Sequence, residues 1–208
     1  MATGLLPASI LPALLEIALK SRLNVQALFD RAGIDPDVVG RADRFITYEQ
    51  LDTLLSTAFR QASDPFFGIS VGRDNHYNAL DGLGNLMATS NTLGEALEQL
   101  LRYKDLLVPY LHFELCARDE GSVLACSSSD ELEFTQMRLH NEVVLATIVS
   151  IARSLLGGDM GLRRVRMRPP EPADLFVYRD FFGVPLEFDC PRNEVVMEPD
   201  KFAAALPT

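Results

Sequence analysis

The chain has 208 residues, enough for one well-buried domain, and its 48% hydrophobic and 23% charged content is typical of a globular protein. A net charge of −10 at pH 7 would repel a phosphate backbone, so the chain alone is a poor candidate for direct DNA binding. The three cysteines lack zinc-ligand spacing and suit a reducing compartment. Residues 1–21 contain no basic leader and no run of about 18 apolar residues, so we expect a soluble cytoplasmic protein without a membrane partner.

The first third of the chain has helical periodicity and predicts a helical lobe over residues 1–75. Asn24 is the expected N-cap of a helix over residues 25–32, and Gly33 its stop. Thr47 and Thr92 each begin a capping-box pattern. Further helices are predicted over residues 9–21, 51–59, 66–71, 80–90 and 93–107.

From residue 111 the hydrophobic period changes to two, which indicates strands. Two hairpins are expected, one from residues 111–117 and 123–127, the other from residues 186–189 and 194–197, with a strand at 164–168 between them. The longest helix is predicted over residues 134–156, and a short one over 172–182. The sequence therefore predicts an α+β fold, in which residues 76–208 form an antiparallel sheet of about five strands packed against the long helix.

The first hairpin carries two of the cysteines, and its register decides whether they meet. With Glu120 and Gly121 as the turn residues, Cys116 lies opposite Ala125 and points away from the face that carries Cys126. We therefore expect free thiols on opposite faces of the hairpin.

Several short motifs occur in one order along the chain. They are Asp64-Pro65-Phe66-Phe67-Gly68-Ile69, Gly72, Leu80-Asp81-Gly82-Leu83-Gly84, Thr92-Leu93-Gly94-Glu95-Ala96-Leu97, Arg102-Tyr103, Tyr178, Phe181 to Phe188 and Leu206-Pro207. In these motifs the chain resembles the N-terminal effector domain of AraC-type transcription regulators, a domain labelled "arabinose-binding" and shared by regulators of ornithine-like and other metabolites. The resemblance implies a single effector-sensing domain over residues 1–208 of a truncated regulator, whose C-terminal helix-turn-helix domain is absent here. Because the helix-rich pattern differs from the all-β barrel of the founding arabinose regulator, the label does not make arabinose the ligand.

Polar residues at the start of the long apolar helix suggest a ligand site. A metabolite pocket combines apolar walls with a few orienting polar groups. We expect one between the helices of residues 80–107 and the long helix, where the candidate residues are Tyr103, Arg138, His140, Asn141, Leu83 and Met87. Taken singly, Arg138, His140 and Asn141 are more simply explained by a solvated first helical turn, and core packing explains Tyr103 at least as well as a ligand contact does.

Other patterns have simpler explanations. Gly68, Gly72, Gly82 and Gly84 follow no strand, so close helix packing explains them better than a dinucleotide loop. A row of alternating arginines could recognise a carboxylate or dock a domain, although a solvated sheet face is the simpler interpretation; its members are Arg164, Arg166 and Arg168.

No catalytic motif is present, so we expect neither an enzyme nor a cofactor or metal site. The favoured function is sensing of a small-molecule effector, such as a fatty, aromatic or amino acid, with DNA contacted only through the missing domain. A homodimer is compatible with this function. The alternatives are a dimerisation module without a physiological ligand, and a helix-turn-helix over residues 9–33. The acidic net charge of the chain makes the helix-turn-helix less favourable.

Overall fold

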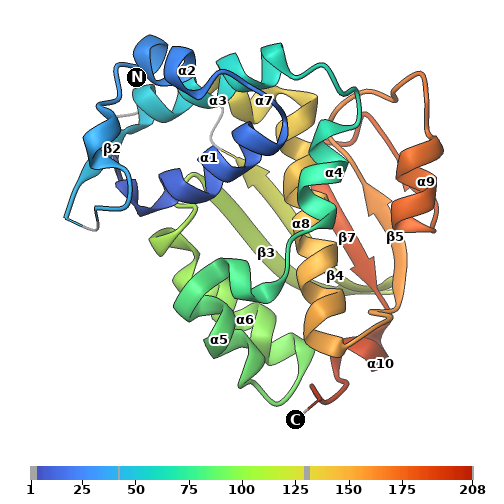
Figure 1. Cartoon of the computed structure of the whole chain (residues 1–208). Helices are drawn as coiled ribbons and strands as arrows, with labels where there is room; N and C mark the ends of the chain where they lie inside the picture. The colour runs from blue at the N-terminus through green and yellow to red at the C-terminus, as the bar shows by residue number, and fades with distance from the viewer. Residues whose placement is uncertain (1–3, 42, 129–131, 208) are drawn as a thin grey trace. The chain divides into compact units, whose positions relative to one another are not determined.

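The computed structural model describes residues 4–41, 43–128 and 132–207 (Figure 1). The chain forms two compact units. The first unit comprises Met1–Phe67 and Ser129–His140, and the second comprises Gly68–Ser128 and Asn141–Thr208.

The first unit contains a two-stranded antiparallel ladder and several helices. Leu6 and Ile46 lie opposite each other in the ladder and are both buried. The elements of this unit are β1 (Leu5–Pro7), η1 (Ala8–Ile10), α1 (Leu11–Lys20), α2 (Val25–Ala32), η2 (Pro36–Val38), β2 (Phe45–Thr47), α3 (Tyr48–Gln61) and α7 (Glu133–Gln136).

The helix ends in this unit follow the predicted capping chemistry. The Asn24 side chain accepts a hydrogen bond from the Ala27 N–H, and Gly33 ends α2 with a φ of 62°. Thr47 and Gln50 form the reciprocal capping box that begins α3. These local predictions are confirmed because each cap depends on residues only three positions apart.

The long helix predicted over residues 134–156 is interrupted, and that prediction is wrong at its start. Met137 is extended, with φ −73° and ψ 143°, and separates α7 from α8 (Arg138–Leu156). The Asp52 carboxylate accepts hydrogen bonds from the backbone N–H groups of Glu133 and Phe134, at 3.0 and 2.9 Å. Asp52, on α3 of the same unit, thus caps the N-terminus of α7 and determines where this turn begins.

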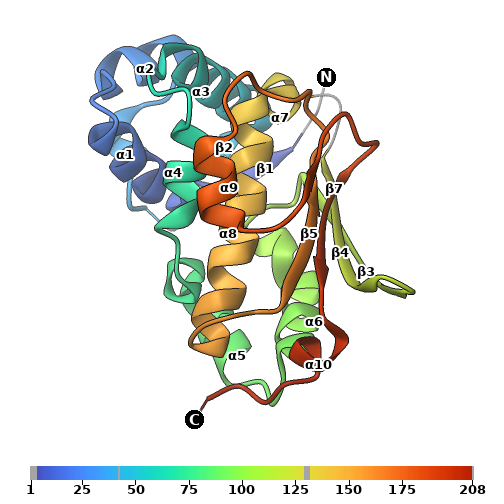
Figure 2. The same ribbon diagram turned by 90° about the vertical axis from the view of Figure 1, so that its right-hand side faces the viewer.

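The second unit is a five-stranded sheet in the order β3-β4-β7-β5-β6. Figure 2 shows α5, α6, α8 and α9 on one side of this sheet, which confirms the α+β class. The strands are β3 (Leu111–Arg118), β4 (Gly121–Ser128), β5 (Leu162–Arg166), β6 (Leu186–Glu187) and β7 (Asn193–Met197). The remaining elements are α4 (Phe67–Arg73), η3 (Tyr77–Leu80), α5 (Asp81–Ala88), α6 (Leu93–Tyr103), η4 (Lys104–Leu106), α9 (Phe176–Phe182) and α10 (Pro199–Phe202).

The second predicted hairpin does not form. β7 lies between β4 and β5 and is antiparallel to both, whereas β6 pairs in parallel with β5, so the sheet is mixed rather than antiparallel. The Met167 N–H donates to the Glu187 carbonyl and the Cys190 N–H donates to the Met167 carbonyl, at 2.8 and 3.0 Å. These bonds hold the segment after β6 against β5 instead of β7.

The first hairpin forms with a different register. Its turn residues are Asp119 and Glu120, and Cys116 lies opposite Val123 rather than Ala125. The shift is two residues, and because side chains alternate with period two, every side chain keeps its predicted face. Cys116 and Cys126 therefore lie on opposite faces, and both are free thiols, as predicted.

The helix α8 forms the centre of the second unit. Leu145, Ala146, Val149 and Ala152 on this helix are completely buried. Among the described residues, α8 is the one helix long and apolar enough to cross a membrane, but 67% of its most apolar window is buried. Such burial is typical of a core helix in a globular protein.

Two glycines of α5 offer a matched test of close packing. A Cβ at Gly84 would lie 1.8 Å from the Tyr77 carbonyl oxygen, whereas a Cβ at Gly82 would meet nothing within 4 Å. We predict that Gly84→Ala lowers the free energy of unfolding by about 2 kcal/mol, because the backbone must move. Gly82→Ala should raise it by about 0.5 kcal/mol, since alanine favours the helix. Urea denaturation measures both, and a neutral Gly84→Ala would contradict the packing.

Candidate functional site

Four polar side chains are buried in the second unit, in one bonded pair between α8 and α9 and another between α8 and β7. Asn141, Glu142, Tyr178 and Asn193, here called the interior polar cluster, are at most 4% exposed. The Tyr178 hydroxyl donates to a carboxylate oxygen of Glu142. The Asn193 side-chain amide donates to Asn141 Oδ1 at 2.7 Å, and Asn193 Oδ1 accepts from the Arg168 N–H at 2.9 Å. A carboxylate and two amides are thereby held in an otherwise apolar interior.

Sequence reasoning selected Asn141 but missed the other three members of the interior polar cluster. Glu142 precedes the completely buried Leu145 and Val149 by three and seven residues, so it falls on the most buried stripe of the helix. This periodicity was a usable signal for Glu142. Tyr178 and Asn193 come from α9 and β7, and only the tertiary fold brings them to α8.

The other predicted site residues have varied surroundings. In the first unit, His140 is 5% exposed and its ring lies edge-on to Phe134, with centroids 5.0 Å apart. Burial lowers the pKa of His140 to about 4, so the imidazole is neutral at pH 7. Arg138, in the same unit, donates to the Pro65 carbonyl at 3.2 Å.

In the second unit, the predicted residues divide between core and surface. Leu83 and Met87 of α5 are 8% and 0% exposed and belong to the core, whereas Tyr103 at the end of α6 is 38% exposed. The expected ligand contacts of all these residues stay a prediction. Within the described ranges, no three His, Cys, Asp or Glu side chains are grouped as metal ligands would be.

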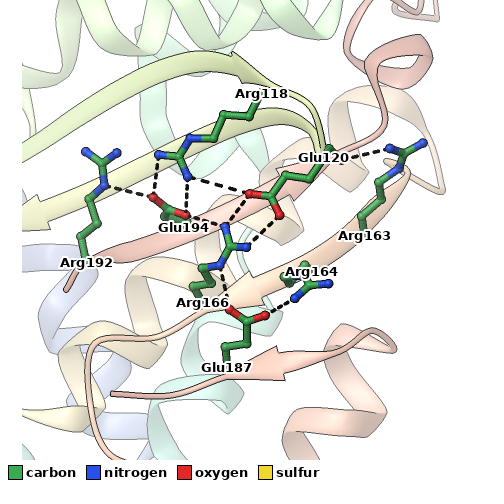
Figure 3. Close-up of polar contacts among 8 residues, drawn as sticks. All are labelled: Arg118, Glu120, Arg163, Arg164, Arg166, Glu187, Arg192 and Glu194. Carbon is green, nitrogen blue, oxygen red and sulfur yellow. Dashed lines mark hydrogen bonds and ion pairs between the residues drawn. The ribbon is translucent and has the colours of Figure 1, made fainter. Parts of the chain in front are cut away.

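A second polar site lies on the face of the sheet opposite α8 (Figure 3). It surrounds an open depression of about 530 Å³. We call it the charged cluster, and its members are Arg118, Glu120, Arg164, Arg166, Glu187, Arg192 and Glu194.

Arg166 and Glu194 form the centre of the charged cluster. Arg166 donates through Nη1 and Nη2 to Glu120, through Nη1 to Glu194, and through Nε to Glu187, at 2.7 to 2.8 Å. Glu194 also accepts a bidentate pair of bonds from Arg118 at 3.0 and 3.1 Å, and one bond from Arg192 at 3.0 Å. Bidentate guanidinium–carboxylate pairs are both strong and directional.

The arginine row of β5 is therefore paired with carboxylates rather than simply solvated. Arg166 and Arg164 both donate to Glu187, while the Arg168 backbone bonds to the interior polar cluster. Beneath the guanidinium groups, Val123, Ala125 and Val196 are at most 1% exposed. Long arginine side chains cover apolar surface in this way while their charged ends remain paired.

The electrostatics of the cluster favour ionised carboxylates. Hydrogen bonds from Arg166 lower the pKa of Glu120 and of Glu187. Burial by itself would raise the pKa of Glu194, but hydrogen bonds from its three arginines outweigh burial and lower it. The cluster is thus a compensated network that the fold holds in its charged form.

Comparison with known proteins identifies the family of this chain. Residues 23–206 match the family described as the arabinose-binding domain of AraC transcription regulator, N-terminal. The chain belongs to this family.

One sequence relative of this AraC-type domain and one solved structure of similar fold come from Pseudomonas aeruginosa. The ornithine utilization regulator is 29% identical over 193 residues, which cover 93% of this chain and 57% of the relative. The transcriptional regulator CdpR has a similar fold, with a TM-score of 0.65 at 18% identity, over 87% of this chain and 55% of CdpR. The AraC-type domain therefore spans about half the length of the relatives that it matches.

The charged cluster predicts a pH-dependent stability. We expect Glu194→Gln to lower the free energy of unfolding at pH 7 by about 2 kcal/mol, because charge-assisted hydrogen bonds are lost. The pKa of Glu194 is lowered in the fold, so its contribution is complete above the unfolded value of about 4.3 and disappears as pH falls through the folded pKa. Urea titrations at successively lower pH, starting from pH 7, should show that the difference in the free energy of unfolding between variant and parent becomes smaller. Glu171→Gln, at an exposed position, is the control, and a difference independent of pH would contradict the prediction.

Proposed function

We propose that this AraC-type domain senses a small-molecule effector and that binding controls the attached DNA-binding motifs. The interior polar cluster carries the proposal. A buried carboxylate and buried amides are costly to desolvate unless they are bonded, and a ligand pocket combines an apolar lining with a few such polar groups. The relatives, which are transcription regulators about twice as long, support a regulatory rather than a catalytic role.

The site is proposed within the second unit, at the start of α8. Asn141 belongs to both the sequence-predicted set and the interior polar cluster. Leu83 and Met87 are buried in α5, but α5 packs against η3, and the Tyr77 N–H of η3 donates to Ser154 near the other end of α8, so both stay candidate residues of lower weight. Tyr103, Arg138 and His140 stay candidate residues of lower weight, because Tyr103 is 38% exposed at the end of α6, and Arg138 and His140 belong to the first unit.

The chemistry of the cluster favours an effector with a cationic or hydrogen-bond-donating group. The Glu142 carboxylate complements an amine, and the Asn141 and Asn193 amides can orient a carboxylate or carbonyl. An amino acid fits this set better than a fatty or aromatic acid, and the name of the ornithine utilization regulator points to the same class. In physical terms, the effector must bind one arrangement of the domain more tightly than another.

Ligand binding can be tested with variants of the interior polar cluster. A panel of amino acids, fatty acids and aromatic acids is screened by thermal shift, and hits are measured by calorimetry. We expect an amino acid to raise the melting temperature of the domain. Glu142→Gln and Tyr178→Phe should each weaken the affinity for that amino acid about tenfold or more, since a hydrogen bond to a charged group is lost.

The control for this experiment is Glu98→Gln, at an exposed position of α6, which should bind as the parent does. Unchanged affinity in both cluster variants, with loss in Tyr103→Phe, would move the site to the surface of α6. If no ligand in the panel binds, the dimerisation module becomes the better description.

The second expectation is that this domain alone does not bind promoter DNA. Its net charge of −10 opposes association with phosphates. A gel-shift assay at low salt, with a regulator carrying both halves as the positive control, measures this. Sequence-specific retardation would contradict it and would favour a helix-turn-helix formed by α1 and α2.

We further propose a cytoplasmic location, as the three free cysteines suggest.

A further inference from the structure

The strand β3 is an open edge of the sheet. Among the described residues, β3 pairs with β4 alone, and its register runs without a bulge from Leu111 to Arg118. Natural proteins blunt edge strands by shortness, proline, bulges or charges that repel another strand. β3 has eight residues and contains no proline, whereas β6, at the other edge of the sheet, is only two residues long. The β3 edge can therefore accept another strand.

The turn determines which backbone groups point outward. Only Asp119 and Glu120 separate Arg118 from Gly121. Arg118 and Gly121 therefore form the hydrogen-bonded pair that closes the hairpin. Because inward and outward groups alternate along a strand, the even-numbered residues of β3 bond to β4. The N–H and C=O groups of Phe113, Leu115 and Ala117 consequently point toward the open edge.

The charges on β3 are self-complementary. Glu114 and Arg118 lie on the same face, two residues to either side of Cys116. In an antiparallel pair centred on Cys116, Glu114 of each copy lies opposite Arg118 of the other. Glu114 is 61% exposed in its ion pair with Arg192, and Arg118 is 35% exposed in its pair with Glu194, so each can take a second partner of opposite charge.

We propose that two copies of this chain pair antiparallel along β3, with the twofold axis at Cys116. Leu115 of each copy then hydrogen-bonds with Ala117 of the other, and the two sheets become one continuous sheet. The proposal names a surface for dimerisation and does not depend on the effector site.

Two neighbouring twofold registers are less favourable. An axis at Glu114 would place two carboxylates opposite each other, and like charges directly opposite destabilise a strand pair. An axis at Leu115 would place Glu114 opposite Cys116 and forgo the ion pairs. The register centred on Cys116 forms two Glu–Arg pairs per dimer.

Cysteine crosslinking tests the register in the native chain. A non-hydrogen-bonded pair has a Cα–Cα distance of about 4.5 Å, within the range of a disulfide. Mild oxidation with copper–phenanthroline should give a disulfide-linked dimer that persists in Cys190→Ser and disappears in Cys116→Ser. Cys126 should not contribute, because burial raises its pKa to about 12. No crosslink, or one that persists in Cys116→Ser, overturns the proposal.

Proline substitution tests the outward hydrogen bonds. Ala117→Pro removes an N–H that points to the open edge and leaves the bonds to β4 intact. Two bonds per dimer are lost, so sedimentation equilibrium should show dimerisation weakened about tenfold or more. Ala117→Ser keeps the N–H and should dimerise as the parent does. A monomeric parent, or an Ala117→Pro dimer as tight as the parent, overturns the proposal.

Charge substitution tests the ion pairs across the axis. Glu114→Arg places two guanidiniums opposite each other, whereas Glu114→Gln only removes the carboxylate. Both variants lose the bond to Arg192, so the comparison isolates the repulsion between copies. Glu114→Arg should dimerise more weakly than Glu114→Gln, and equal dimerisation of the two contradicts the register.

Discussion

β7 runs between β4 and β5, so all five of its side chains are buried on one face of the sheet or the other. One of them is the Glu194 carboxylate, on the face away from α8. A carboxylate in that position is stable only when its charge is compensated. Arg118, Arg166 and Arg192 supply the compensation from β3, β5 and the segment before β7. One ionised group thus ties together strands that are far apart in the sequence and protects the apolar surface beneath them.

The same strand order explains which features of the fold could be predicted. Asn24, Gly33 and Thr47 act on residues a few positions away, so the ends of their helices follow from the sequence. The faces of the first hairpin were also predictable, because an error of two residues in register leaves period-two alternation unchanged.

Pairing between distant strands was not predictable in this way. The turn residues after β6 suggested a hairpin with β7, but nothing local to that segment specifies that β7 pairs with β4 and β5 instead. The start of α7 likewise depends on Asp52, which accepts a hydrogen bond from the Glu133 N–H, 81 residues later in the chain. For the candidate site, Asn141 followed from its position at the start of an apolar helix. Tyr178 and Asn193 could be identified as members of the site only from the tertiary fold.

β7 also joins the two polar sites of the second unit. Because side chains alternate along a strand, Asn193 faces α8 and bonds to Asn141, while the next residue, Glu194, faces outward and bonds to Arg118 of β3. An effector that displaced Asn193 would act on the strand that positions Arg118, and Arg118 is the residue proposed to pair across the dimer axis. Coupling between sites requires that one element have different energies in the two ligand states. β7 carries both contacts on adjacent residues, Asn193 toward the proposed effector site and Glu194 toward Arg118, so dimerisation measured with and without effector would report that coupling directly.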